Sequence, residues 1–147
     1  MADHDPIRLL MAEDDQEDQM LVRKAFAKAR LANHLDMVRD GEELLDWLLR
    51  RGKHVNAHRP DLILLDLNMP RKDGRQALSE MKAIPELHQI PVVVLTSSAA
   101  EEDIVRSYDL GVNSYIQKPV TFEKLVEVIE ALGKYWFEIV KLPPNGG

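Results

Sequence analysis

Three acidic residues of this chain stand at the ends of apolar runs, where their chemistry needs an explanation. Glu13 and Asp14 follow "RLLMA", and Asp66 follows the unbroken apolar run "LILL". Burying an unpaired carboxylate is unfavourable. Such an acid therefore belongs either at the lip of a strand in a solvated cleft or beside a metal or another cation.

Neutral and basic polar residues follow this run and two others. They are Asn68 after "LILLDL", Thr96 after "VVVL", and Lys118 with Pro119 after "YIQ". Each of these residues, like each of the acids above, has an ordinary structural explanation when it is taken alone. Aspartates cap helices, most lysines lie at the surface and threonine is common in strands. Their recurrence at the ends of separate apolar runs indicates a shared site.

Glu13, Asp14 and Asp66 would not cluster for the sake of stability. Two like unit charges ~4 Å apart repel by about 4 kcal/mol at an effective dielectric constant near 20. A hard divalent cation would relieve this repulsion, and oxygen ligands with some retained water suit Mg²⁺. If the fold brings the three residues together, the sequence predicts a magnesium site.

The elements that must position these residues follow from the apolar pattern. Short apolar runs alternate with longer amphipathic segments, which is typical of an α/β fold with a parallel sheet. The expected strands are residues 7–12, 35–38, 62–65, 92–95 and 113–116. Right-handed crossovers would bring the carboxyl ends of all strands to one edge, where such sheets bind ligands.

Apolar residues between the expected strands recur at helical spacing, so each intervening segment has one stripe that could face the sheet. The stripes are Leu21, Val22, Ala25, Phe26 and Ala29; Leu44, Leu45, Leu48 and Leu49; Ala77, Leu78 and Met81; and Ile104, Val105 and Tyr108. Asp40 with Glu43, and Ser98 with Glu101, have the spacing of capping boxes. The five histidines show no metal-ligand spacing and are expected in loops or at the surface.

The composition excludes several classes of function. A formal net charge of −6, from 25 acidic and 19 basic residues, argues against nucleic acid or anionic lipid as a partner. The chain has no cysteine, which excludes disulfides, thiol catalysis and cysteine-bound metals. The acidic start "MADHD" is unlike a signal peptide, and no apolar run approaches the ~20 residues of a membrane span. We therefore expect a cytoplasmic protein.

The length of 147 residues suits one domain. We expect a flexible N-terminus at residues 1–6, one domain at 7–140, and a C-terminal tail at 141–147 that is rich in proline and glycine.

Together these residues resemble a receiver domain of the two-component response regulators. The resemblance runs from about residue 7 to residue 140 and rests on the acidic pair, "DLNMP" with Gly74 following, Thr96 after "VVVL", and "YIQKP". It implies a flavodoxin-like three-layer sandwich whose five parallel strands have the order 2-1-3-4-5. It also implies a phosphoacceptor protein in a phosphorelay rather than an enzyme.

The resemblance assigns the acceptor and the metal ligands. Asp66 would accept a phosphoryl group from a histidine kinase. Asp14 and Asp66 would bind Mg²⁺, or Mn²⁺ in its place, through their carboxylates. Asn68 would bind it through its backbone carbonyl and Glu13 through a metal-bound water. Glu13 stands where many receivers have aspartate, and its longer side chain should still reach that water.

The resemblance also assigns the switch. Lys118 would pair with the incoming phosphoryl group, the Thr96 hydroxyl would bond to it after transfer, and Tyr115 would change rotamer. Pro119 would follow a cis peptide bond, and Gly74 would have a structural role. The response would remodel the face built from the fourth helix, the fifth strand and the fifth helix. Asp15 is expected to start a helix rather than to bind metal.

The last helix carries more apolar surface than one contact with the sheet needs. Phe122, Leu125, Val126, Ile129, Leu132 and Trp136 form one stripe, and Val128, Tyr135 and Ile139 lie partly on another. A large exposed apolar patch usually meets a partner. We expect a homodimer through Val128, Tyr135, Trp136 and Ile139, and the alternative is that the C-terminal segment folds back on its own domain. The stretch "YWFEIVKLPP" also resembles response regulators that pair with bacterial phytochromes.

Two other functions remain open at this point. One is an aspartyl-phosphate Mg²⁺ phosphohydrolase, although such enzymes usually carry a second aspartate as acid/base two residues after the nucleophile. Here that position holds Asn68. The other is a degenerate receiver that acts only as a docking module, and the intact carboxylates with Lys118 argue against it.

Overall fold

The computed structural model describes residues 8–29, 34–67, 74–96, 114–117 and 121–135. The strands are β1 (Arg8–Ala12), β2 (His34–Val38), β3 (Leu62–Asp66), β4 (Val92–Thr96) and β5 (Ser114–Gln117). The helices are α1 (Gln16–Ala29), α2 (Gly41–Leu48), the 3-10 turn η1 (Gly52–His54), α3 (Gly74–Lys82) and α5 (Phe122–Tyr135). All five strands pair in parallel in the order β2-β1-β3-β4-β5, which is the order that the resemblance implied.

The strands begin and end within one residue of the positions expected from the sequence. The differences matter at two ends, because Asp66 and Thr96 are the last residues of β3 and β4 rather than the first residues after them. The expected N-terminal segment and C-terminal tail lie outside the described residues, as does the helix expected around Ile104, Val105 and Tyr108.

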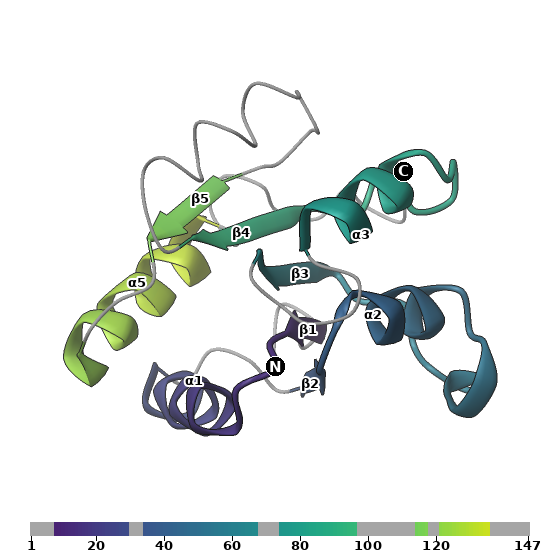
Figure 1. Cartoon of the computed structure of the whole chain (residues 1–147). Coiled ribbons are helices and arrows are strands. Elements are labelled where there is room, and N and C mark those ends of the chain that lie inside the picture. The colour runs from purple at the N-terminus through teal and green to yellow at the C-terminus, as the bar shows by residue number, and fades with distance from the viewer. Residues whose placement is uncertain (1–7, 30–33, 68–73, 97–113, 118–120, 136–147) are drawn as a thin grey trace, which may run out of the picture.

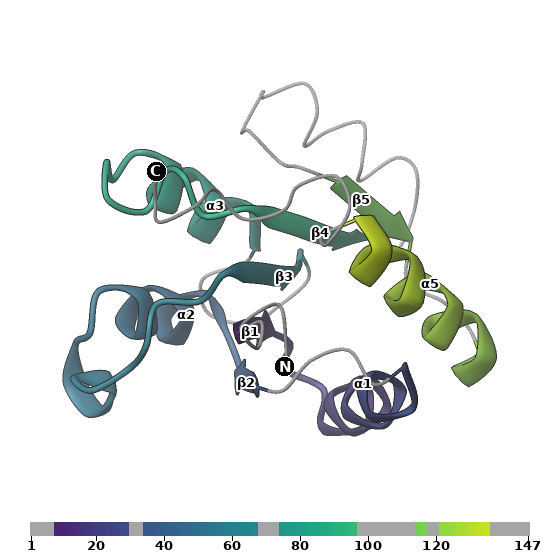
Figure 2. The ribbon, with the colours of Figure 1, turned by 180° about the vertical axis from the view of Figure 1, so that it is seen from behind.

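The sheet separates two helical layers, as Figure 1 and the reverse view in Figure 2 show. Helices α1 and α5 pack together on one face, and α2 and α3 pack together on the other. Successive strand residues point to opposite faces. In β1, Leu9 and Met11 join the core under α1 and α5, whereas Leu10 and Ala12 join the core under α2 and α3. This arrangement is the expected three-layer sandwich.

The apolar stripes predicted for the helices are the faces that they bury. The buried residues are Val22, Ala25 and Phe26 of α1; Leu44, Leu45 and Leu48 of α2; Ala77, Leu78 and Met81 of α3; and Leu125, Val126 and Ile129 of α5. A helix with one such stripe covers a sheet and leaves its polar side in water. Among the residues described, no helix combines the length and the apolar character needed to cross a bilayer.

The predicted capping box at the start of α2 is present in a modified form. The Asp40 side chain accepts a hydrogen bond from the backbone N–H of Glu43 at 2.8 Å. The Glu43 side chain reaches back to the backbone N–H of Arg39, one residue before the cap, at 2.8 Å. Both bonds satisfy donors at the helix start. The second predicted box, Ser98 with Glu101, lies outside the described residues.

Candidate functional site

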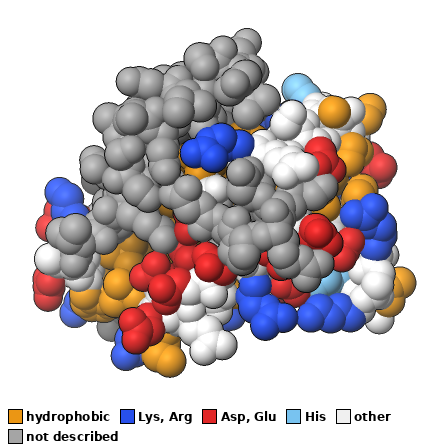
Figure 3. All heavy atoms as spheres, viewed as in Figure 1, with side chains coloured by type: hydrophobic (Ala, Val, Ile, Leu, Met, Phe, Trp, Pro, Cys, Tyr) orange, Lys and Arg blue, Asp and Glu red, His pale blue; other side chains and the backbone are white. Residues whose placement is uncertain are grey.

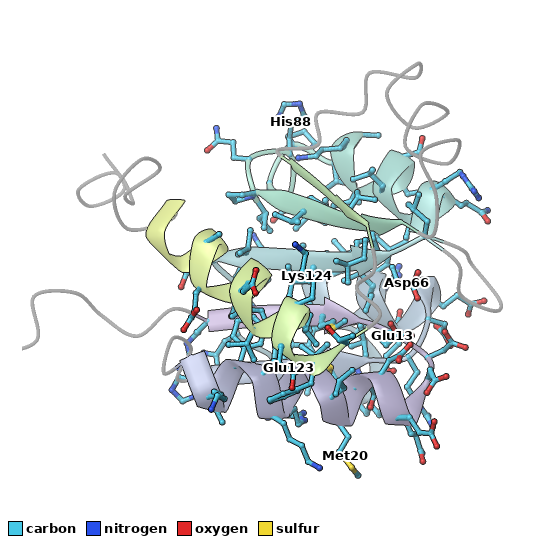
Figure 4. All side chains as sticks on the ribbon, turned by 90° about the vertical axis from the view of Figure 1, so that its left-hand side faces the viewer. Glu13, Met20, Asp66, His88, Glu123 and Lys124 are labelled. Carbon is cyan, nitrogen blue, oxygen red and sulfur yellow. The ribbon has the colours of Figure 1, made fainter. Side chains whose placement is uncertain are left out.

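The register of the sheet places Glu13 and Asp66 side by side. Ala12 at the end of β1 is level with Leu65 of β3, so the next residue of each strand continues beyond the same edge. Residues two apart in a strand point to the same face. Glu13 follows Met11 by two residues, and Met11 lies under α1 and α5. Figure 4 shows Glu13 and Asp66 close together at this end of the sheet.

The three predicted carboxylates form one cluster. Glu13, Asp14 and Asp66 each offer an oxygen, and these oxygens lie within 4.8 Å of one another. Glu13 is 1% exposed and Asp66 2% exposed, whereas Asp14 is exposed. Charges at this separation repel by about 3 to 4 kcal/mol per pair at an effective dielectric constant near 20. Three hard oxygen donors, two of them buried and one open to solvent, fit a divalent cation.

The turn between β1 and α1 is held by its own backbone and side chains. The Glu13 N–H donates to the Val38 carbonyl of β2 at 2.9 Å, and the Asp15 N–H donates to Glu13 Oε2 at 3.1 Å. Asp15 Oδ1 accepts from the N–H groups of Glu17 at 2.8 Å and Asp18 at 3.2 Å. Asp15 is therefore the N-cap of α1, as predicted, and its carboxylate is used in the helix rather than in the cluster.

Gly74 lies directly behind the end of β3. Its N–H donates to the Leu67 carbonyl at 3.1 Å. A Cβ at position 74 would clash with the Asp66 carbonyl oxygen and would lie 2.7 Å from the Leu67 Cα. Only a residue without a side chain allows α3 to begin this close to Asp66. The structural role predicted for Gly74 is thus a close approach of two backbones.

The surroundings of the cluster are acidic on the outside and apolar beneath. Glu17 and Asp18 occupy the first turn of α1, where the helix dipole favours negative charge. Acidic side chains gather on the face shown in Figure 3. Between α1 and α5 lies a small pocket of about 40 Å³, lined by Met11, Glu13, Asp18, Leu21, Val22, Leu95 and Leu125. The cluster therefore lies between an apolar interior and an acidic surface.

The structure describes the backbone of the two predicted switch residues. Thr96 ends β4, and because Asp66 is level with Leu95, Thr96 lies one residue further along the neighbouring strand. Tyr115 is in β5, level with Val94. Three predicted site residues lie outside the described part of the chain: Asn68, Lys118 and Pro119.

The predicted dimer residues are only partly within the described chain. Val128 and Tyr135 belong to α5, of which the structure gives the backbone at these positions, and Trp136 and Ile139 lie outside the described residues.

One described residue that contacts the cluster was not predicted from the sequence. The Gln19 side-chain amide donates a hydrogen bond to the Glu13 carbonyl at 2.5 Å. The signal that could have found it is a polar side chain one helical turn after the acidic turn, since such a residue lies over the start of its own helix.

Comparison with known proteins gives a consistent picture. A family model described as response regulator receiver domain matches residues 9–130. The response regulator Rcp1 of Synechocystis sp. is 41% identical over 138 residues, which cover 94% of each chain. The crystal structure of the phosphorylated cyanobacterial phytochrome response regulator RcpA has a TM-score of 0.84 and 42% identity, covering 95% of this chain and 99% of that one. The Mn²⁺-bound form of Rcp1 has a TM-score of 0.82 and 40% identity, covering 94% of this chain and 99% of the other.

Proposed function

This chain belongs to the response regulator receiver domain family, and we propose that Asp66 is the residue that accepts its phosphoryl group. Proteins of this family are signalling proteins that work through phosphorylation, not classical enzymes. One observation carries the assignment of Asp66. Asp66 ends a fully buried strand, and its carboxylate lies in one cluster with the carboxylates of Glu13 and Asp14.

The proposed reaction is transfer from a phosphohistidine. An Asp66 carboxylate oxygen attacks the phosphorus, an O–P bond forms as the N–P bond breaks, and the imidazole nitrogen leaves with the electron pair and takes a proton from solvent. A carboxylate is a competent nucleophile for such a step. Phosphoryl transfer needs mainly positioning and charge neutralisation. Burial of β3 supplies the first of these by fixing the direction of Asp66.

We assign the cluster to Mg²⁺, with Mn²⁺ as a substitute. Asp14 and Asp66 would bind the ion through their carboxylates, Asn68 through its backbone carbonyl and Glu13 through a metal-bound water. The ion would neutralise charge on the phosphoryl oxygens. The hard oxygen donors of the cluster support a divalent cation. The Mn²⁺-bound structure of the similar protein Rcp1 gives independent support.

The proposed response to phosphorylation involves Lys118, Thr96 and Tyr115. Lys118 pairs with the phosphoryl oxygens, and the Thr96 hydroxyl moves inward to bond to them, followed by Tyr115. The new charge thereby remodels the face made by segment 97–113, β5 and α5. The register supports this role for Thr96, because it ends the strand next to Asp66.

The proposed phosphoryl donor is a histidine kinase, and more narrowly a bacterial phytochrome. The support is the similarity to Rcp1 and to RcpA, which is a phytochrome response regulator. Transfer from a purified phytochrome kinase should be faster than transfer from kinases of other signalling pathways. Equal rates from all donors would contradict the narrower assignment.

Mass spectrometry after incubation with acetyl phosphate and Mg²⁺ tests the acceptor. We expect the wild type to gain one phosphoryl group and Asp66→Asn to gain none. Asp61→Asn is the matched control, because Asp61 lies just before the opposite end of β3, where it accepts a bond from the Arg8 N–H at 3.0 Å. A mass gain in Asp66→Asn would refute the assignment. Turnover of a small phosphomonoester by the wild type would instead favour a phosphohydrolase.

We also propose a homodimer through α5 and the residues that follow it. In α5, Leu125, Val126 and Ile129 are buried against the sheet. Val128 and Tyr135 are seven residues apart and therefore share a helical face beside this stripe. Trp136 and Ile139 would extend the apolar surface.

Sedimentation of the protein tests the dimer. The wild type should sediment as a dimer at tens of micromolar, and Val128→Glu as a monomer. Glu127→Gln is a control at the neighbouring exposed position of the same helix. A wild type that is monomeric both with and without beryllofluoride would rule out the dimer.

A further inference from the structure

Gln19 connects the first turn of α1 to the acidic turn that precedes it. Its side-chain amide donates to the Glu13 carbonyl at 2.5 Å, and its backbone N–H donates to the Asp15 carbonyl at 2.9 Å. The side chain is partly buried. One residue of α1 thus holds both ends of the three-residue turn from Glu13 to Asp15.

The Glu13 carbonyl belongs to the peptide unit that joins Glu13 to Asp14. This unit is planar, so a hydrogen bond that fixes the carbonyl also fixes the orientation of the Asp14 N–Cα bond, and the Asp14 side chain projects from that Cα. Glu13 has further anchors, since its N–H and its Oε2 both take part in hydrogen bonds. Among the described residues, no hydrogen bond or ion pair holds the Asp14 carboxylate. Within the described part of the chain, the position of Asp14 is therefore set by the backbone of this turn.

The chemistry of an amide suits this role. It donates a hydrogen bond without adding charge, so it neither neutralises the cluster as a cation would nor increases its repulsion as an acid would. We infer that Gln19 is a positioning residue that aims the Asp14 carboxylate at the metal through the Glu13 carbonyl. The inference rests on the proposed metal site and goes beyond it, because Gln19 itself is no ligand.

The test is Mn²⁺ affinity, measured from the EPR signal of free Mn²⁺ during titration of the full chain. Gln19→Met keeps the length of the side chain and removes the donor. We expect it to raise the Kd about fivefold, which corresponds to about 1 kcal/mol. The matched control is Gln16→Met, the same substitution on the exposed first residue of α1, and its Kd should stay within about twofold of wild type.

Two further variants separate position from charge and from damage to the fold. Gln19→Glu cannot donate and adds a negative charge, which by itself would favour a cation, so weaker Mn²⁺ binding in this variant would come from the lost bond. Gln19→His offers a ring N–H at similar reach and should recover most of the affinity. An unchanged Mn²⁺ affinity in Gln19→Met, or an equal loss of Mn²⁺ affinity in Gln16→Met, would overturn the inference. If the wild type itself fails to bind Mn²⁺, the proposed metal site fails instead.

Discussion

Gly74 allows helix α3 to begin directly against the backbone of Asp66. The start of α3 lies against the backbone of Asp66 and Leu67, and Gly74 is the point of contact. The Gly74 N–H also holds the Leu67 carbonyl, just beyond the acceptor. Forcing this contact apart would strain the end of β3, and with it the position of Asp66 beside Glu13 and Asp14, which follow the neighbouring strand β1.

Gly74→Ala should lower both stability and phosphorylation. Its methyl group has no space, and overpacking of this kind usually lowers the free energy of unfolding by about 1 to 3 kcal/mol. We also expect slower phosphorylation by acetyl phosphate at a temperature where the variant is folded. Urea denaturation and the time course of the mass change measure the two effects.

Gly52→Ala is the control for this prediction. Gly52 has a φ of +60° and open space at its Cβ position, so an alanine there is strained but meets no neighbour. It should lower stability by about 1 to 2 kcal/mol and leave the phosphorylation rate unchanged. If both variants slow phosphorylation equally, the effect belongs to general stability and not to the contact with Asp66.

At the scale of single residues, the sequence predicted the carboxylates but not what holds them. Glu13, Asp14 and Asp66 could be found because acids at the ends of apolar runs are unfavourable without a cation. The polar residue Gln19 could have been noticed at the start of the helix, but its bond to the Glu13 carbonyl depends on how tightly the chain turns between β1 and α1. The role of Gly74 was predicted, whereas its cause, the distance between two backbones, required the structure.

At the scale of elements, α2 is secured at its start by a cluster around Glu43. Glu43 Oε1 accepts from the Arg39 N–H at 2.8 Å, while Oε2 lies 3.0 Å from His54 Nε2 and 3.5 Å from Lys53 Nζ. The His54 ring also contacts Trp47, with centroids 4.9 Å apart. These contacts tie η1 to α2.

The charge of Glu43 makes this contribution dependent on pH. Burial alone would raise the pKa of Glu43, but the bonds from Arg39 and His54, with the nearby Lys53 charge, together hold its pKa below the usual value. A lowered pKa means that the folded state favours the carboxylate. The stabilisation is therefore complete above the pKa of an unfolded glutamate and is lost as the pH falls through the folded pKa.

Glu43→Gln should therefore be less stable than the wild type by about 1 kcal/mol near neutral pH. The difference should shrink as the pH falls below about 4.3, the ordinary glutamate pKa. Urea denaturation across this range measures it. Glu42→Gln makes the same charge change at the exposed neighbour in the first turn of α2 and should show a smaller difference. A difference for Glu43→Gln that persists at low pH would show that the carboxylate charge is not responsible.

Prediction was more successful for whole elements than for their contacts. The strands and helical stripes follow from apolar periodicity, which reports burial directly. The capping box was predicted from Asp40 and Glu43, although the reach of Glu43 to Arg39 was not. His54 was expected in a loop or at the surface, yet its side chain is only 13% exposed. Its partner is eleven residues away, so local pattern gives no sign of the contact.

At the scale of the molecule, the parallel sheet brings the three carboxylates of the site together and thereby also causes their mutual repulsion. Glu13 and Asp14 follow β1, and Asp66 ends β3, so the two neighbouring strands hold the acids together as long as the sheet is intact. In the unfolded chain Asp66 separates from Glu13 and Asp14, so its repulsion with them disappears. The fold is therefore expected to be less stable than its core allows until a cation binds, and metal binding should be linked to folding.

Mg²⁺ should accordingly raise the melting temperature of the wild type. A ligand that binds only the folded state at about 100 times its Kd adds about 2.7 kcal/mol, which corresponds to a rise of roughly 5 to 10 °C for a chain of this size. Asp66→Asn removes one charge from the cluster, so without metal it should melt at or above the wild-type temperature. With Mg²⁺ its increase should be clearly smaller, because a ligand is lost.

Differential scanning calorimetry with and without Mg²⁺ measures these four melting temperatures. Asp61→Asn removes a charge at the other end of β3, outside the cluster, and should keep the full wild-type increase. An equal increase in Asp66→Asn and wild type would place the ion elsewhere on the protein. No increase in the wild type at millimolar Mg²⁺ would mean that the three carboxylates tolerate one another without a cation, and the assignment of the cluster as a metal site would then be wrong.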